Sequence, residues 1–206
     1  MDRFTVRFAV VLCAAAVVFA APALADEHPG AIMSPEEMAK MMEEWTKFST
    51  PSEHHKQLDV FVGTWDTVTR MWMSGPGSPP TESKGTSEIK WVLDGRFIME
   101  EHEGDMMGQP YNGIGFTGYD NFRNMYAATW INNQSTAMLT MTGMHDPAGK
   151  TWTFYGEMDE PMLSVHGRTV KSDVVLESPD KYVFTIYDLH AGDDYRAVEI
   201  TYNRVK

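Results

Sequence analysis

The chain has 206 residues, and 17 Lys and Arg against 29 Asp and Glu give it a formal net charge of −12 at pH 7. A chain this acidic repels nucleic acid and anionic membrane surfaces, and we therefore exclude nucleic acid as a partner. Its single cysteine, Cys13, lies in the apolar N-terminal stretch. Disulfides, thiol catalysis and cysteine metal sites are therefore excluded if that stretch is removed.

Residues 1–25 have the organisation of a cleavable signal peptide. Arg3 and Arg7 supply a basic region, an apolar run follows, and Ala23-Leu24-Ala25 fits a small-x-small cleavage site before Asp26. The apolar run is too short to span a bilayer. We therefore expect an exported protein, periplasmic or secreted, with no integral membrane segment after cleavage.

Residues 26–62 read as a leader and a helical segment. Ser34 is placed to cap a helix, with Pro35 at its first position and Glu37 completing a capping box. Five apolar residues follow at helical spacing: Met38, Met41, Met42, Trp45 and Phe48. This pattern predicts a helix over 34–48, and a second short helix is expected in SEHHKQLDVF.

From Gly63 onward, short runs of β-type residues alternate with turn signals. The predicted strands are 64–73, 82–92, 95–103, 110–119, 124–133, 136–144, 150–157, 164–176, 181–189 and 195–204. Short turns between them favour antiparallel neighbours, and a closed sheet has no exposed edges. We predict one domain, 63–206, as an all-β, ten-stranded, up-and-down lipocalin-like barrel preceded by N-terminal helices. A β-sandwich is the alternative.

Two glycines inside a predicted strand, Gly113 and Gly115, leave bare backbone that another residue must cover. With a four-residue turn at 120–123, Gly113 falls opposite Trp130 and Gly115 opposite Ala128. Because side chains alternate along a strand, these residues share one face, and we expect the Trp130 ring to cover the glycines.

The same face carries Tyr111, Tyr119 and Tyr126, and we expect it to form the inner wall of the barrel around a ligand. The opposite face is also apolar, with Ile114, Phe116, Met125, Ala127 and Ile131. Periodicity alone therefore does not decide which face points inward. A barrel plugged by Trp130, acting through its surface or as a homodimer, is the alternative to an open lumen.

Arg96 follows the Asp94-Gly95 hairpin signal. Pointing inward, it would be a buried cation that needs an anion, either Glu101 or the carboxylate of a ligand. Pointing outward, it would be a surface arginine at the end of a hairpin.

The stretch FVGTW resembles the first-strand signature of the lipocalin and fatty-acid-binding-protein superfamily. In those barrels the tryptophan packs beneath an arginine of the last strand. That resemblance implies a contact between Trp65 and Arg204 in VEITYNR.

A longer resemblance, over Ser52 to Arg204, identifies the chain as a member of the DUF1579 family of uncharacterised bacterial proteins. It rests on GTWDTVTRMWM, ESKGTSE, LDGRFIMEEHEGDMMGQPYNGIGFTGYDN, the stretch 126–130 and EITYNR. It implies a lipocalin-like barrel and no established activity.

Histidine, methionine and glutamate residues offer three alternative sites, for haem, copper(I) or a divalent metal. Nitrobindin-type haem barrels look similar and share the Gly-x-Trp start, with His166 and His190 as candidate haem ligands. Met138, Met141, Met144 and His145 offer soft copper(I) ligands, although strand alternation separates Met141 from the other methionines. Glu100 and His102 share a strand face and could hold a divalent metal, but an exposed acidic strand end with a solvated histidine is the preferred interpretation.

The expected function is binding of a small apolar or amphipathic ligand in the lumen. Trp130, Tyr111, Tyr119 and Tyr126 would line the site, and Arg96 would hold a polar head. No hydrolase, metalloprotease, phosphate-loop or dinucleotide motif is present. We therefore expect no cofactor, and the sequence favours a binding protein over an enzyme.

Overall fold

The computed structural model describes residues 33–75, 77–148, 150–161 and 164–206. The predicted signal peptide, 1–25, lies outside the described residues. The chain divides into two units, Met1–Lys40 and Met41–Lys206.

Within the described residues, three helical elements precede the sheet: α1 (Pro35–Ser49), α2 (Glu53–Lys56) and the 3-10 helix η1 (Gln57–Phe61). The predicted capping box of α1 is present. Glu37 Oε2 accepts a hydrogen bond from the Ser34 N–H at 2.8 Å, and Ser34 Oγ accepts one from the Glu37 N–H at 3.3 Å. No helix in the described part of the chain combines the length and apolar character needed to cross a membrane.

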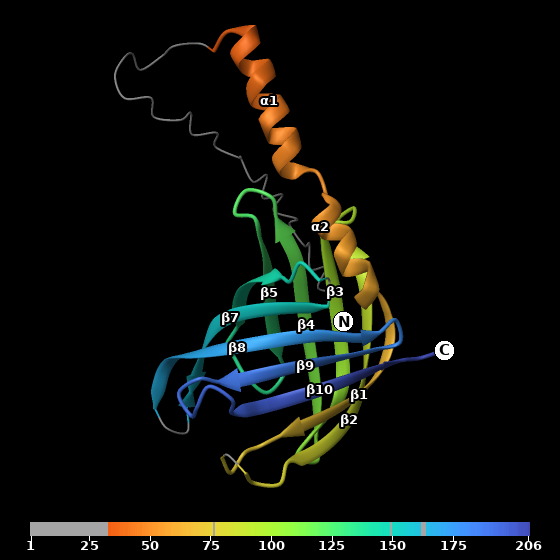
Figure 1. Cartoon of the computed structure of the whole chain (residues 1–206), viewed down its shortest axis with the longest axis vertical. Coiled ribbons are helices and arrows are strands. Elements are labelled where there is room, and N and C mark those ends of the chain that lie inside the picture. The colour runs from red at the N-terminus through yellow and green to blue at the C-terminus, as the bar shows by residue number, and fades with distance from the viewer. Residues whose placement is uncertain (1–32, 76, 149, 162–163) are drawn as a thin grey trace, which may run out of the picture. The chain divides into compact units, whose positions relative to one another are not determined.

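The ten predicted strands form a closed antiparallel barrel in which each strand pairs with its neighbours in sequence (Figure 1). They are β1 (Gly63–Met71), β2 (Thr81–Val92), β3 (Phe97–Met106), β4 (Gln109–Asp120), β5 (Met125–Asn132), β6 (Leu139–His145), β7 (Thr151–Glu160), β8 (Val165–Ser178), β9 (Lys181–Asp188) and β10 (Arg196–Arg204). Seven residue pairs join β1 to β10, from Trp65 opposite Arg204 to Met71 opposite Val198. This pairing closes the sheet, so the up-and-down barrel is confirmed and the β-sandwich is wrong.

One end of the barrel is filled by side chains from η1 and the strands around it. Phe61 packs edge-on against Trp152 and Tyr182, with ring centroids 4.8 and 5.0 Å away, and Trp65 meets Tyr182 at 4.8 Å. Leu58 of η1 is buried beside them. We call this the filled end. The far end carries the turns at 107–108, 133–138 and 189–195, because successive turns of an up-and-down barrel alternate between its ends.

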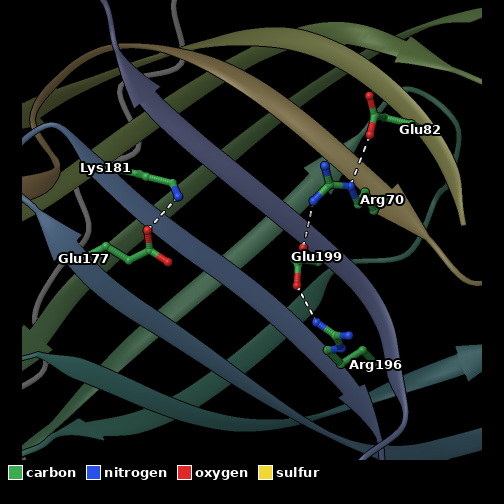
Figure 2. A network of polar contacts seen from close by, with 6 residues as sticks. All are labelled: Arg70, Glu82, Glu177, Lys181, Arg196 and Glu199. Carbon is green, nitrogen blue, oxygen red and sulfur yellow. Dashed lines mark hydrogen bonds and ion pairs between the residues drawn. The ribbon is translucent and has the colours of Figure 1, made fainter.

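The outer face of β1, β2 and β10 carries a network of ion pairs (Figure 2). Arg70 contacts Glu82 at 3.1 Å and Glu199 at 3.3 Å, and Arg196 contacts the other oxygen of Glu199 at 2.7 Å. Each of these partly exposed pairs contributes about 0–1 kcal/mol to the free energy of unfolding. None of the four side chains faces the lumen.

Candidate functional site

The Trp130 ring covers the bare backbone of both strand glycines. A Cβ on Gly115 would lie 2.9 Å from Trp130 Cε3, and a Cβ on Gly113 would overlap the six-membered part of the ring. Both glycines are buried, whereas Ile114 and Phe116 between and beside them are exposed. The tyrosine–tryptophan face therefore points inward, as expected, and the space above the glycines is filled by tryptophan.

The predicted register between β4 and β5 was wrong by two residues. Gly115, not Gly113, lies opposite Trp130, and Tyr119 lies opposite Tyr126, because the turn occupies 121–124 instead of 120–123. Asn124 adopts a positive φ of 53° in this turn, a conformation that asparagine tolerates better than most residues. A slip of two residues keeps every side chain on its original face, so the assignment of faces was unaffected.

The four aromatic residues proposed for the ligand wall separate into two groups. Trp130 Nε1 donates a hydrogen bond to Tyr111 Oη at 2.9 Å. Tyr126 instead donates to Gln57 Oε1 at 2.7 Å and to the His54 carbonyl at 3.0 Å, and Tyr119 stacks on the His54 ring at 4.2 Å. Tyr119 and Tyr126 thus join the barrel to α2 and η1 at the filled end, while Tyr111 and Trp130 line the inner wall beyond it.

The structure places Arg96 on the β2–β3 hairpin. Its Nη1 donates to the Leu93 carbonyl at 3.2 Å and lies 3.9 Å from Asp94 Oδ2, and the side chain is 40% exposed. Glu101, its suggested anion, instead pairs with Lys90 at 2.6 Å. On the neighbouring strand β3, the structure instead places an acid, Glu100, on the inner wall.

Glu100 and His102 face the lumen and are joined by a serine that sequence analysis missed. Ser87 Oγ donates to Glu100 Oε1 at 2.7 Å and lies 2.9 Å from His102 Nδ1. Ser87 and His102 are both buried. The preferred interpretation of this segment as a solvated acidic strand end was therefore wrong. Ser87 lies opposite His102 in the β2–β3 pairing, and only this pairing could have revealed the contact.

Tyr202 of β10 completes the polar cluster by donating to the same Glu100 oxygen at 3.1 Å. Its ring stacks on Tyr182 at 4.2 Å. Oε2 of Glu100 receives no hydrogen bond from the described residues, and it is not among the fully buried polar atoms without a partner.

Burial sets the protonation behaviour of the polar cluster. It raises the pKa of Glu100, although the hydrogen bonds from Ser87 and Tyr202 act in the opposite direction. Burial alone lowers the pKa of His102. For Tyr202 the pKa is well above its ordinary value, first because of burial and then because of the negative charge of Glu100. Each shift favours the neutral form, as expected for groups held away from bulk water.

The arrangement differs from a nucleophilic triad. Ser87 has one proton, and when Glu100 is ionised that proton is donated to the carboxylate, so His102 must donate to Ser87 through Nδ1. In that state the histidine is not a base toward the serine. Its ring instead lies against the backbone of Gly85 and Gly104, where an added Cβ would lie 2.9 Å from ring atoms. The cluster is therefore suited to hydrogen bonding and charge recognition.

Side chains of the inner wall keep accessible surface inside the barrel. Five apolar residues with this property are packed against the core cluster but only half-buried: Ala128, Leu139, Phe184, Ile186 and Ile200. In a solidly filled barrel such inward-facing residues would be fully buried, as Trp65 and Tyr126 are at the filled end. The inner wall is therefore less closely packed beyond the filled end than at the filled end.

Two hollows open on the described surface. The larger, about 630 Å³, lies at the tips of loops of the far end and is lined by Met106, Met107, Gln109, Pro110, Asn133 and Gln134. The smaller, about 360 Å³, lies over β3, β4 and β5, and much of its lining is exposed, including Glu101, Glu103, Ile114 and Ile131. It therefore belongs to the outer surface of these strands and not to the inner wall.

The residues considered for metal or haem do not converge. Met141 is buried, whereas Met138 and Met144 are 64% and 70% exposed. His145 stacks on Trp152 at 4.0 Å. His166 is exposed beside Asp159, and His190 accepts the Thr169 N–H at the β9–β10 turn. The described residues contain no group of three or more His, Cys, Asp or Glu side chains placed to hold a metal.

Comparison with solved structures shows the barrel fold at low sequence identity. Rv2717c from M. tuberculosis is 10% identical, with a TM-score of 0.54, covering 76% of this chain and 100% of that chain. A redesigned β-barrel, b11L5F_LGL, is 14% identical, with a TM-score of 0.40 and coverage of 73% and 96%. Another designed barrel, EF1p2_mFAP2b bound to DFHBI, is 12% identical, with a TM-score of 0.39 and coverage of 73% and 98%.

None of the curated proteins compared with the chain matches it in sequence. The family described as "Protein of unknown function (DUF1579)" matches residues 50–204, which include α2, η1 and the whole barrel. The chain therefore belongs to the DUF1579 family.

Proposed function

We propose that the barrel binds a small amphipathic molecule in its lumen, in the part lined by Trp130 and Tyr111 beyond the filled end. The observation that carries this proposal is the contrast along the inner wall. Trp65 and Tyr126 are fully buried at the filled end, whereas the inward-facing apolar side chains beyond it keep accessible surface.

The inner wall also combines the two kinds of group that small-molecule sites use. Apolar and aromatic side chains give contact area, while a few convergent polar groups fix orientation. Here the polar groups are Glu100, Ser87 and Tyr202, which come from β3, β2 and β10 and meet at one carboxylate oxygen. A ligand with an apolar body and one polar group matches this wall.

The test is binding of a neutral fluorescent probe, N-phenyl-naphthylamine, to the wild type and to two matched variants. Leu139→Trp adds bulk on the inner wall directly opposite Trp130, whereas Thr140→Trp adds the same bulk at the next, exposed position. We expect saturable binding to the wild type and to Thr140→Trp, and at least about tenfold weaker binding to Leu139→Trp, since filling the lumen excludes the ring. Equal affinity for both variants, or no binding to the wild type, would overturn the proposal.

Native mass spectrometry of the purified full chain gives an independent measurement. A molecule held in the lumen adds mass to the folded protein and is lost on denaturation. We expect the retained mass to be reduced in Leu139→Trp and unchanged in Thr140→Trp. An adduct that persists equally in both variants would place the ligand outside the lumen.

A further inference from the structure

The lumen contains a carboxylate whose hydrogen bonds satisfy one oxygen and leave the other available. Glu100 Oε1 accepts from both Ser87 and Tyr202, at 2.7 and 3.1 Å, while Oε2 has no hydrogen bond from the described residues. The Glu100 side chain shares the inward face of β3 with the buried residues Ile98 and His102. Both donors are neutral hydroxyl groups, so an ionised Glu100 keeps a full negative charge at a site away from bulk water. A positive partner stabilises such a charge, and without one the carboxyl group stays protonated.

The basic side chains of the inner wall do not supply that partner. Arg168 pairs with Asp188, at 2.7 Å between Nη2 and Oδ2. Arg204 donates to the carbonyls of Val60 and Val62 at the filled end, both at 2.7 Å. None of the ion pairs found among the described residues includes Glu100, and the causes of its raised pKa are burial and the hydrogen bonds from Ser87 and Tyr202. A cation that pairs with an ionised Glu100 would therefore come from a bound molecule.

Aromatic rings of the inner wall lie near Glu100, whose negative charge contributes to the raised pKa values of Tyr111, Tyr182 and Tyr202. Tyr202 and Tyr182 are stacked at 4.2 Å on the β9–β10 side. On the β4–β5 side, Tyr111 and Trp130 are joined by a hydrogen bond and lie 5.8 and 6.3 Å from the His102 ring. The faces of tyrosine and tryptophan rings attract cations through their quadrupoles, and desolvated sites of this kind recognise ammonium groups.

We propose that the lumen selects a small cationic ligand, a protonated amine or quaternary ammonium group on an apolar body, with the cation between Glu100 Oε2 and the rings of Tyr111 and Trp130. This inference rests on the proposed lumenal binding and names the class of ligand. The sequence analysis suggested an anionic ligand, whose carboxylate would be held by Arg96, whereas the ligand proposed here is a cation. The net charge of −12 favours the approach of cations in the same sense.

The pH dependence of binding has a definite sign. Burial raises the pKa of Glu100, so an acidic medium protonates it and removes the anion that the ligand needs. His102, whose pKa is lowered by burial, also gains a positive charge in acid and then repels the ligand. Tyr111, Tyr182 and Tyr202, the other titratable groups that face Glu100, have pKa values raised by burial and stay neutral as the pH rises. Affinity for a permanent cation therefore increases with pH until Glu100 is fully ionised.

Three probes with one ring system and different head groups test the proposal by isothermal titration calorimetry: naphthylmethyl-trimethylammonium, naphthylmethanol and naphthylacetate. The proteins are the full-length wild type, Glu100→Gln and Glu101→Gln. Glutamine keeps an oxygen for Ser87 and Tyr202 but carries no charge. Glu101→Gln is the matched control, because it makes the same change one residue away on the outer face, where Glu101 pairs with Lys90.

We expect the cationic probe to bind the wild type and Glu101→Gln at least about tenfold more tightly than the anionic probe, because an interaction with a buried charge exceeds that with a neutral group. Glu100→Gln should lose about tenfold in affinity for the cation, together with its pH dependence, and should no longer bind the cation more tightly than naphthylmethanol. Equal binding of the three probes, or cation binding unaffected by Glu100→Gln, would overturn the charge selection and leave lumenal binding standing. Absence of binding by all three would overturn both.

Discussion

The guanidinium carbon of Arg204 lies 4.0 Å from the centroid of the Trp65 ring, and the two residues are direct partners in the β1–β10 pairing that closes the barrel. Arg204 also donates to the carbonyls of Val60 and Val62 at 2.7 Å. Trp65, in turn, donates through Nε1 to the Phe61 carbonyl at 2.8 Å. The first and last strands of the barrel and the end of η1 are thus joined through one arginine and one tryptophan.

Arg204→Ala should destabilise the barrel by about 3 kcal/mol, because it removes a cation–π contact and two charged donors to carbonyls. Arg204→Lys should recover only part of this loss, since an ammonium group lacks the planar fork that reaches both carbonyls. Urea unfolding followed by tryptophan fluorescence measures the change. Arg123→Ala, at an exposed turn, is the control and should shift stability by less than about 0.5 kcal/mol. A loss as large in Arg123→Ala as in Arg204→Ala would contradict this assignment.

Gly113→Ala should destabilise the protein by about 1–3 kcal/mol, because the added methyl group overlaps the Trp130 ring and forces it to move. Displacement of the ring should also break its hydrogen bond to Tyr111 and change the near-ultraviolet circular dichroism.

A double-mutant cycle supplies the control for Gly113. In a Trp130→Ala background the methyl group meets no ring, so Gly113→Ala should cost less than it does in the wild type. The coupling energy should be on the order of 1 kcal/mol or more, as for other residues in direct contact. Additive effects would show that the ring does not depend on the bare backbone.

Glu100→Gln should stabilise the ligand-free protein by about 1–3 kcal/mol at pH values where Glu100 is ionised in the folded state, because it removes a buried charge that lacks a cation. The pKa of Glu100 is raised on folding. The wild type is therefore favoured while Glu100 stays protonated, and it loses stability as the pH rises from the unfolded-state pKa through the folded-state pKa. Chemical denaturation across this pH range measures the free energy of unfolding.

Two variants distinguish the titration of Glu100 from the titration of other groups. Glu101→Gln, on the outer face, should retain the wild-type slope, whereas Glu100→Gln should flatten it. His102 contributes with the opposite sign, because its pKa is lowered on folding and its stabilisation is lost as the pH falls below about 6.5. A slope identical in the wild type and Glu100→Gln would refute an ionising Glu100 in the lumen.

Asn121→Asp should loosen residues 47–50 without unfolding the barrel. Asn121 Nδ2 donates to the carbonyls of Phe48 and Thr50 at 3.0 and 2.8 Å, and a carboxylate would repel these oxygens. We expect faster tryptic cleavage after Lys47 and a barrel stability within about 0.5 kcal/mol of the wild type. Asn203→Asp, at an exposed position of β10, is the control and should be cleaved at the wild-type rate. Equal cleavage of both variants would mean that Asn121 does not hold this segment.

Local patterns in the sequence were enough to predict the order of the strands and which side chains share one face of a strand. Alternation has a period of two, so the face shared by Trp130, Gly113 and Gly115 survived a register error of two residues. The capping box of α1 was equally local, because Ser34 and Glu37 are only three residues apart. Spacing along the sequence is therefore enough to predict a feature that depends only on residues close to one another in the chain.

Only the tertiary structure decided the chemistry of the lumen. Residues 100–103 carry acidic side chains on both faces of the strand, so their alternation does not predict which face points inward. In the closed barrel, Glu100 and His102 point inward and contact Ser87, and Glu100 also contacts Tyr202. The contact between Glu100 and Tyr202 joins residues 102 positions apart. A hydrogen bond across that distance depends on the pairing of β1 with both β2 and β10, which no local pattern specifies. For the same reason, the presence of the Glu100 carboxylate on the inner wall could be recognised only in the folded structure.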